Sequence, residues 1–254
     1  MPGAVNFTTM AMVDGWRRAW RRAWPAHCLA CGGRGVGGRD LCAACHAGLP
    51  WLRTACPRCA LPLPAPAAVP DQVRDRLFGE CLRIALDQSR PPLDAVHAAF
   101  VYAPPLDRLL PRFKFHGDLA AGRLLAALMH EAAPRFPHDA VIVPVPLHRK
   151  RLRQRGYDQA LELAKPLAVA CSLPLRDDLL LRARATAAQS RLHADQRKRN
   201  LRNAFEVDAP AALPSCVVLI DDVMTTGATL HAAAKALRKA GVARVEAWVC
   251  ARVP

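Results

Sequence analysis

Two adjacent aspartates, Asp221 and Asp222, follow a short apolar run in the C-terminal part of the chain and precede a turn rich in hydroxyl groups. The run at residues 217–220 is typical of a buried strand, which would bring both carboxylates to the carboxyl edge of a sheet, where ligands bind in open α/β folds. The turn at residues 225–229 opens a helix, whose free N–H groups and positive dipole end suit a phosphate. Carboxylates suit hydroxyl groups or a magnesium ion instead. The segment therefore predicts a site for a ribose 5-phosphate.

A simpler interpretation of this segment is a generic strand, turn and helix. In that case one aspartate lies near the start of the helix, and Thr225 or Thr226 caps it. A single carboxylate or a single threonine would favour this interpretation. The combination of paired acids, threonines and Gly227, which lets an oxyanion approach the main chain, favours the phosphate site.

Six of the ten cysteines form three Cys-x-x-Cys pairs, whose first members are spaced 14 residues apart. Two such pairs supply the four thiolates of a tetrahedral zinc site, which is closed to water and therefore structural. By proximity in sequence, this site would comprise Cys28, Cys31, Cys42 and Cys45. The even spacing also allows either of these pairs to join the third pair.

A second zinc site would draw on Cys56, Cys59 and Cys81. Phe78 stands where a fourth Cys-x-x-Cys pair would begin, so we expect this site to be degenerate or three-coordinate unless His27 or His46 supplies a ligand. The remaining cysteines lie in apolar segments, where they are expected as buried hydrophobic residues. They are Cys171, Cys216 and Cys250.

The chain carries a formal net charge of +15, which favours a polyanionic partner such as nucleic acid, a phosphorylated sugar or acidic lipid. Five basic residues lie between Arg149 and Arg155, and a second basic stretch spans residues 182–205. A solvated charge run is the simpler interpretation of either stretch. Trp16, Trp20 and Trp24 would share one side of an N-terminal helix, which suits an anionic surface but also simple docking on the rest of the chain.

Strands and helices alternate in the C-terminal part, which predicts an α/β fold with a parallel sheet flanked by helices. Strands are expected at residues 95–102, 141–145, 217–220 and 245–251, and helices at residues 119–133, 159–170 and 228–240. We expect an N-terminal extension at residues 1–27, a cysteine-rich zinc ribbon at 28–90 and the α/β domain at 91–254. No apolar run is long enough to span a membrane and no secretory signal is evident, so a cytoplasmic protein is expected.

Together these motifs resemble the ComF family, whose members combine a zinc ribbon with a type I phosphoribosyltransferase fold. Residues 143–160, the segment Lys114-Phe-His-Gly-Asp118 and residues 182–205 carry the resemblance, beside the acid pair and its turn. The chain departs from the family at Asp158, where we expect asparagine, at Pro111, within a segment that is usually helical, and at Phe78.

The resemblance implies binding of 5-phosphoribosyl-1-pyrophosphate (PRPP), with magnesium bound alongside it. Asp221 and Asp222 would hold the ribose 2'- and 3'-hydroxyls, and residues 182–205 would form a mobile loop that excludes water. The residues so assigned to PRPP are Asp221, Asp222, Val223, Met224, Thr225, Thr226, Gly227, Ala228 and Thr229. Those assigned to pyrophosphate and the basic loops are His148, Arg149, Lys150, Arg151 and Arg191.

Two functional hypotheses follow. In the first, the protein transfers the phosphoribosyl group of PRPP to a nucleophile and releases pyrophosphate, although the sequence identifies neither a general base nor an acceptor-binding residue. In the second, it binds single-stranded DNA through the zinc ribbon and the basic stretches, and PRPP is regulatory or vestigial. The family is associated with DNA uptake, so DNA-uptake proteins are expected partners in either case.

Overall fold

A computed structural model of the chain describes residues 26–63, 92–183, 204–208 and 213–254. The chain forms two compact units, Met1–Leu49 and Pro50–Pro254. In the described part of the chain, no helix has the length and apolar character needed to cross a membrane. The N-terminal extension with its three tryptophans lies outside the described residues.

The described part of the first unit is built around its cysteines. Its one helix there, α2 (Ala43–Ala47), buries none of its own residues. Leu41 and Leu49 are the large aliphatic side chains that this part of the unit buries. So small an apolar core cannot hold a module of this size without a further link, which is the situation in which small domains rely on metal ions.

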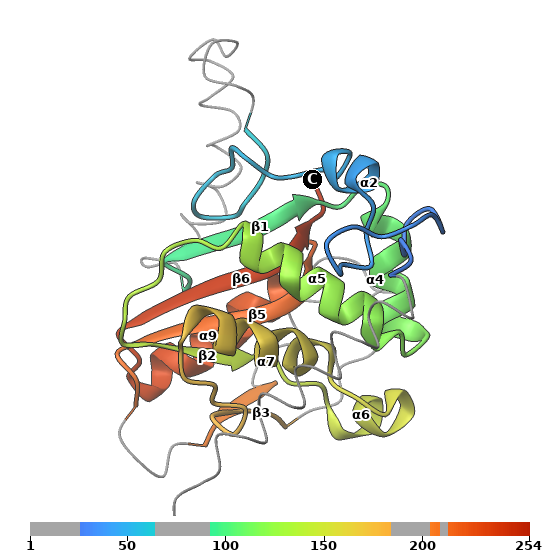
Figure 1. The fold of residues 1–254 in the computed structure, drawn as a ribbon. Coiled ribbons are helices and arrows are strands. Elements are labelled where there is room, and N and C mark those ends of the chain that lie inside the picture. The colour runs from blue at the N-terminus through green and yellow to red at the C-terminus, as the bar shows by residue number, and fades with distance from the viewer. Residues whose placement is uncertain (1–25, 64–91, 184–203, 209–212) are drawn as a thin grey trace, which may run out of the picture. The chain divides into compact units, whose positions relative to one another are not determined.

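Four parallel strands form the main sheet of the second unit, in the order β1-β6-β5-β2 (Figure 1). They are β1 (Ala95–Val101), β2 (Ala140–Pro144), β5 (Cys216–Met224) and β6 (Arg244–Arg252). Residues 217–220 are fully buried in the centre of the sheet, which explains their continuous apolar run. The predicted parallel sheet is therefore confirmed.

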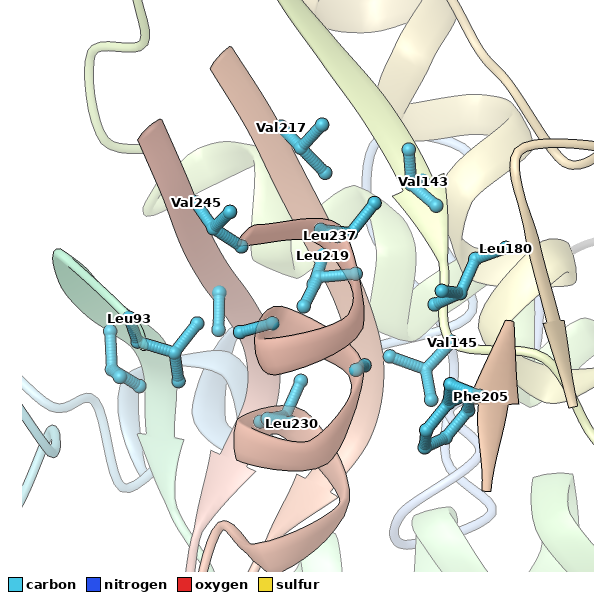
Figure 2. Close-up of a cluster of buried hydrophobic side chains, with 14 of the residues drawn as sticks. Leu93, Val143, Val145, Leu180, Phe205, Val217, Leu219, Leu230, Leu237 and Val245 are labelled. Carbon is cyan, nitrogen blue, oxygen red and sulfur yellow. The ribbon is translucent and has the colours of Figure 1, made fainter. Parts of the chain in front are cut away.

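Helices cover both faces of this sheet. On one face, α5 (Leu119–Glu131) and α7 (Gln159–Cys171) pack against each other and against the strands. On the other face, α9 (Ala228–Ala240) inserts Leu230 and Leu237 among Val217, Leu219 and Val245 (Figure 2). Alternate residues of β5 thus serve the two faces, and Gly241 closes α9 in the left-handed conformation with φ 111°.

An antiparallel hairpin of β3 (Leu180–Arg182) and β4 (Phe205–Val207) extends the α9 face. Leu180 and Phe205 pack beside Val143 and Val145 at the end of β2 (Figure 2). The hairpin holds the two ends of the segment for which we predicted a mobile loop. Residues 184–203 of that segment, including Arg191, lie outside the described residues.

Six of the seven predicted elements lie within two residues of their observed bounds. The seventh, β5, continues four residues beyond its predicted end because its pairing with β6 extends to Met224 and Arg252. Both aspartates therefore lie within the strand and not in the turn after it. The pairing of β5 with β6 holds the backbone of both aspartates from the β6 side.

Two further helices differ from the sequence-based expectations. The segment α4 (Leu106–Phe115) remains helical through Pro111, because four buried apolar side chains compensate for the missing N–H. The basic stretch after β2 is not a loop but the helix α6 (Arg149–Arg155). It buries none of its residues and is closed by His148 at its start and by Gly156, with φ 80°, at its end.

Residues 50–57, which we expected in the cysteine-rich module, pair with β1 in the second unit. The N–H of Leu52 donates to the carbonyl of Ala99, and the N–H of Val101 donates to the carbonyl of Pro50, each at 2.9 Å. The ring of Trp51 lies 4.6 Å from that of Phe100. This segment therefore packs along the outer edge of β1.

Candidate functional site

The acid pair, Asp221 and Asp222, lies near the carboxyl end of the central strand β5. Adjacent residues of a strand face opposite sides of the sheet, so the two carboxylates leave β5 on different faces. The Asp221 carboxylate accepts the N–H of Asp222 at 2.8 Å, and the Asp222 carboxylate accepts the N–H of Val223 at 2.7 Å. These short contacts orient both side chains along the edge of the sheet.

Burial and repulsion from Asp222 set the protonation of Asp221. Burial, and secondly the neighbouring Asp222 carboxylate, raise the pKa of Asp221 to about 7 against the opposing effect of Lys114. Asp221 therefore stays protonated to a higher pH than an ordinary aspartate. A ligand that brings hydroxyl donors or a bound cation would favour the ionised form.

The phosphate turn, residues 225–229, leads from β5 into α9. Gly227 is the residue before α9, has φ 72°, and provides no side chain to cap the helix. The hydroxyl of Thr226 accepts the N–H of Ala228, the first residue of α9, at 3.5 Å, and the residues Thr225 and Thr226 are exposed at this positive end of the helix dipole. This positive φ favours glycine, and a Cβ here would also displace the terminal methyl of Met224, which lies 2.5 Å from its position.

Arg252 supports the turn from behind, a role that sequence reasoning missed. Its side chain is 7 % exposed and donates to the carbonyls of Met224 at 3.2 Å and Thr225 at 2.6 Å. It also donates to the carbonyl of Cys59 at 2.8 Å. Because the carbonyls of the turn are held on the inside, its N–H groups and hydroxyls remain available outside. The partners of Arg252 are distant in the sequence, so no local pattern signalled this role.

Lys114 joins the acid pair from α4, and it explains the segment whose role the sequence left obscure. Its Nζ lies 3.0 Å from Oδ1 and 2.8 Å from Oδ2 of Asp222. Burial lowers the pKa of Lys114, but the Asp222 carboxylate raises it more, so the net shift is upward and the lysine stays charged. The centre of the site therefore holds the two aspartates, with the Lys114 ammonium in contact with Asp222.

Asp158, where we expected asparagine, clamps the chain on both sides of α6. One carboxylate oxygen accepts the N–H groups of Ala160 and Leu161 at the start of α7, and the other accepts the N–H of Leu147 at 2.7 Å. Both oxygens act as acceptors, which an amide side chain cannot match. Burial raises the pKa of Asp158, and the Asp222 carboxylate raises it further.

The basic helix α6 presents the side chains assigned to pyrophosphate. The imidazole of His148 accepts the N–H of Lys150 at 3.2 Å, so this histidine caps the helix. Burial lowers the pKa of Arg151, and burial together with the charge of Arg151 lowers that of Arg182 on β3. Asp221 and Asp158 oppose this lowering at Arg182. Guanidinium groups suit a polyphosphate.

The first two cysteine pairs converge on one point. The zinc cluster, Cys28, Cys31, Cys42 and Cys45, has all four sulfur atoms within 4.8 Å of one another. The Sγ atoms of Cys31 and Cys42 are 3.8 Å apart, which matches sulfurs held about 2.3 Å from a tetrahedral zinc ion. The structure thus brings the first two pairs together, and the cluster supports a structural zinc.

The third pair lies in a turn with the same backbone pattern, which we call the second knuckle, residues 55–62. The N–H of Cys56 donates to the carbonyl five residues later, and the N–H of Ala60 donates back to Cys56, as Cys28, Gly33 and Gly32 do in the first turn. Ala60 takes the positive φ, 53°, that Gly32 takes there. Cys81 and Phe78 lie outside the described residues, so a degenerate second site remains a prediction.

Of the three remaining cysteines, all predicted to be buried, two are buried as expected. Cys216 and Cys250 are buried, whereas Cys171, at the end of α7, is only partly buried. Its sulfur lies 3.8 Å from Nδ1 of His130 on α5. Burial raises the pKa of all three thiols.

Comparison with known proteins identifies both parts of the chain. Residues 19–82 match the double zinc ribbon domain, and residues 203–254 match the phosphoribosyl transferase domain. The chain is 34 % identical over 218 residues to DNA utilization protein YhgH of Salmonella typhi, covering 84 % of this chain and 90 % of that protein. It is 35 % identical over 182 residues to Competence protein F of Haemophilus influenzae, covering 68 % and 77 %. Competence protein ComFC of Streptococcus pneumoniae is 26 % identical over 155 residues, covering 61 % and 67 %.

Proposed function

The chain belongs to the family of DNA utilization protein YhgH and Competence protein F, and from this premise we propose that it binds PRPP at the carboxyl end of β5 in the service of DNA uptake or use. The observation that carries the proposal is the acid pair beside the threonine-rich turn that opens α9. A ribose phosphate offers hydroxyls to the former and a phosphate to the latter. The free thiols of Cys28, Cys31, Cys42 and Cys45 and a PRPP ligand both fit a protein of the cytoplasm.

In this proposal each part of PRPP meets groups of matching chemistry. Asp221 and Asp222 accept the ribose 2'- and 3'-hydroxyls, and the phosphate turn donates to the 5'-phosphate. The guanidinium groups of Arg151 and Arg182 lie toward the pyrophosphate. Magnesium would travel with the pyrophosphate, because this ion binds substrate phosphates, water and few protein carboxylates.

The proposal is tested by calorimetric titration of the zinc-loaded full chain with PRPP and magnesium. Replacing both Asp221 and Asp222 by asparagine removes two charge-assisted hydrogen bonds, each worth about 1.5–3 kcal/mol, so affinity should fall about 100-fold or more. Asp178→Asn is the matched control, since Asp178 is an exposed partner of Arg176. Absence of binding to the unaltered protein, or unchanged binding by the double variant, would contradict the proposal.

A second function, binding of single-stranded DNA, is favoured by one surface feature. The ring of Phe115 is 64 % exposed, and the guanidinium carbon of Arg155 lies 5.2 Å from its centroid. Exposed aromatic rings beside arginines stack on bases without regard to sequence. The basic helix α6 next to this ring would then contact the DNA phosphates.

The DNA hypothesis is tested through its salt dependence. If Arg149, Lys150 and Arg153 each contact one phosphate, their joint replacement by alanine should lower the slope of log affinity against log salt by about 2. Replacement of Arg123, Arg135 and Lys239, a matched set of basic residues outside α6, should leave the slope unchanged. An unchanged slope in the α6 variant would exclude this helix as the DNA contact.

Transfer and binding are separated by pyrophosphate release from labelled PRPP, with candidate acceptors and with or without single-stranded DNA. Turnover that depends on the acid pair would support a phosphoribosyltransferase. No turnover, together with DNA binding that survives replacement of the acid pair, would leave PRPP as a regulatory or vestigial ligand.

A further inference from the structure

The last turn of α4 brings a single lysine to the acid pair from 108 residues away in the sequence. The Lys114 ammonium contacts both oxygens of Asp222, at 3.0 and 2.8 Å. The Asp222 side chain is only 6 % exposed, whereas that of Lys114 is 30 % exposed. The ammonium therefore caps the carboxylate on its open side, where a ligand would approach.

The surrounding residues hold this lysine in place. Gln159, which is 3 % exposed, donates to the carbonyl of Lys114 at 3.4 Å and accepts from Arg155 at 2.8 Å. On the other side, Asp118 caps α5 and pairs with Arg112 at 2.7 Å, which fixes the chain just after Lys114. The backbone of Lys114 is thus tied to α7 and, through Gln159, to the basic helix α6.

The carboxylates around Lys114 indicate that this lysine does more than stabilise the fold. Three buried or half-buried carboxylates approach one another here, from β5 and from the start of α7, and each raises the free energy of its ionised neighbours. A buried ion pair contributes little net stability, because desolvation offsets its attraction. A lysine held so firmly against one carboxylate is better explained by the use of that carboxylate.

We propose that Lys114 is a positioning residue of the sugar-phosphate site, whose ammonium keeps the acid pair ionised and Asp222 oriented to accept the ribose hydroxyls. This inference rests on the proposed binding of PRPP. The charged groups that face the acid pair from the packed elements are Lys114 of α4, Arg155 of α6, Asp158 of α7, Arg182 of β3 and, as a buried thiol, Cys250 of β6. The side chain of Lys114 contacts the pair directly, at hydrogen-bond distance from Asp222.

The sign of the expected pH effect follows from this arrangement. Lys114 lowers the pKa of Asp221, so its removal raises that pKa. A nearby opposite charge shifts a carboxyl pKa by about 1–3 units, so Asp221 would then be largely protonated at neutral pH. Binding that needs ionised carboxylates is lost as the pH falls and regained as it rises.

The test is a PRPP titration of full-length Lys114→Met with magnesium between about pH 6 and pH 9. Near neutral pH we expect affinity to fall about tenfold or more, and the deficit to shrink as the pH rises, because the binding midpoint moves upward by about one unit or more. Lys165→Met is the matched control, since Lys165 pairs with Glu162 on the surface of α7. It should bind PRPP with the affinity and pH profile of the unaltered protein.

Two results would overturn the inference while PRPP binding itself stands. One is Lys114→Met binding as the unaltered protein does at every pH. The other is a uniform loss with no shift of the pH midpoint, which a purely structural lysine would produce. Failure of the unaltered protein to bind PRPP is a different result, and it would remove the proposed function together with the inference.

A second variant decides the matter if Lys114→Met does not fold, as judged by its circular dichroism and thermal melting. Lys114→Arg keeps the positive charge, so it should bind PRPP within about threefold of the unaltered protein and keep its pH midpoint. A loss as complete as that of the variant with both Asp221 and Asp222 replaced by asparagine would show that positive charge at this position does not sustain binding, and would overturn the inference.

Discussion

The zinc cluster and the phosphate turn are built by opposite means. The zinc cluster lies in a unit whose described part buries few apolar side chains, so its four cysteines must be held by what they bind. The phosphate turn follows four fully buried strand residues and opens a helix packed on the same core. The zinc cluster therefore depends on its metal for its shape, whereas the phosphate turn is preformed by the sheet.

Removal of zinc is the strongest test of this comparison. Binding of a structural zinc by cysteine ligands contributes about 10 kcal/mol or more to folding, so a chelator should unfold residues 26–49. Hydrogen exchange should show the loss of protection there, while the main sheet and PRPP binding remain. Cys28→Ser with Cys45→Ser should reproduce this result without a chelator.

The metal content sharpens the same test. Our assignment of a complete set of ligands to the zinc cluster alone predicts one zinc ion per chain. Two ions per chain would show that the second knuckle is a working site, and protection that survives in zinc-free protein would contradict the metal-dependent shape of the first.

Arg252 links the second knuckle to the phosphate turn, so the cysteine-containing turns and the phosphate turn are not wholly separate. Arg252→Met leaves the carbonyls of Cys59, Met224 and Thr225 without their charged donor, at a cost of about 2–4 kcal/mol in the free energy of unfolding. PRPP affinity should fall as well, since the turn loses its support. Thermal melting and calorimetry measure the two effects, with Arg176→Met, which removes an exposed ion pair, as the control.

An unchanged melting temperature for Arg252→Met would show that water replaces the guanidinium at no cost. A lower melting temperature with unchanged PRPP affinity would show that the turn keeps its shape without Arg252. Either result would show that the phosphate turn does not depend on its link to the second knuckle. The turn would then owe its shape to the sheet alone.

Sequence reasoning found what local pattern encodes. The apolar run before the acid pair, the glycine at the end of α9 and the spacing of the cysteines each specify their structure through near neighbours. The contact of Lys114 with Asp222 and the contacts of Arg252 span distant parts of the chain, and no local pattern signals them. The helix α6 escaped detection because it has no apolar face, although His148 and Gly156 were readable as its caps.

The same glycine substitution can be made in both regions. Gly227 and Gly32 have φ values of 72° and 77°, so alanine at either position costs about 1–2 kcal/mol in backbone strain. A Cβ at Gly227 also meets Met224, whereas one at Gly32 has nothing within 4 Å. We therefore expect Gly227→Ala to weaken PRPP binding, and Gly32→Ala to weaken zinc retention alone.

Thermal melting, PRPP titration and the rate of zinc release to a chelator distinguish the two glycine variants. An effect of Gly32→Ala on PRPP binding would show that the zinc cluster influences the phosphate turn. The two regions could then no longer be treated as independently built.

The smallest expected effect concerns the carboxylate of Asp158. It accepts backbone hydrogen bonds on both sides of α6, and its negative charge influences the pKa of Asp221. Asp158→Asn turns an amide N–H₂ toward the N–H of Leu147 or of Ala160, and the lost acceptor costs about 1 kcal/mol. The substitution also removes a negative charge that adds, after burial and Asp222, a small part to the raised pKa of Asp221. The pKa of Asp221 should therefore fall, and PRPP binding should persist to a lower pH than in the unaltered protein.

This shift is opposite in sign to the one expected for Lys114→Met, so the two variants together test whether charge or shape governs the acid pair. The pH midpoint of PRPP binding, followed by calorimetry, should move down for Asp158→Asn and up for Lys114→Met. Asp178→Asn, which removes an equivalent charge at the surface, should leave it in place. If both site variants instead moved the midpoint in the same direction, their effects would come from disturbed packing, and the preformed site would owe its properties to shape alone.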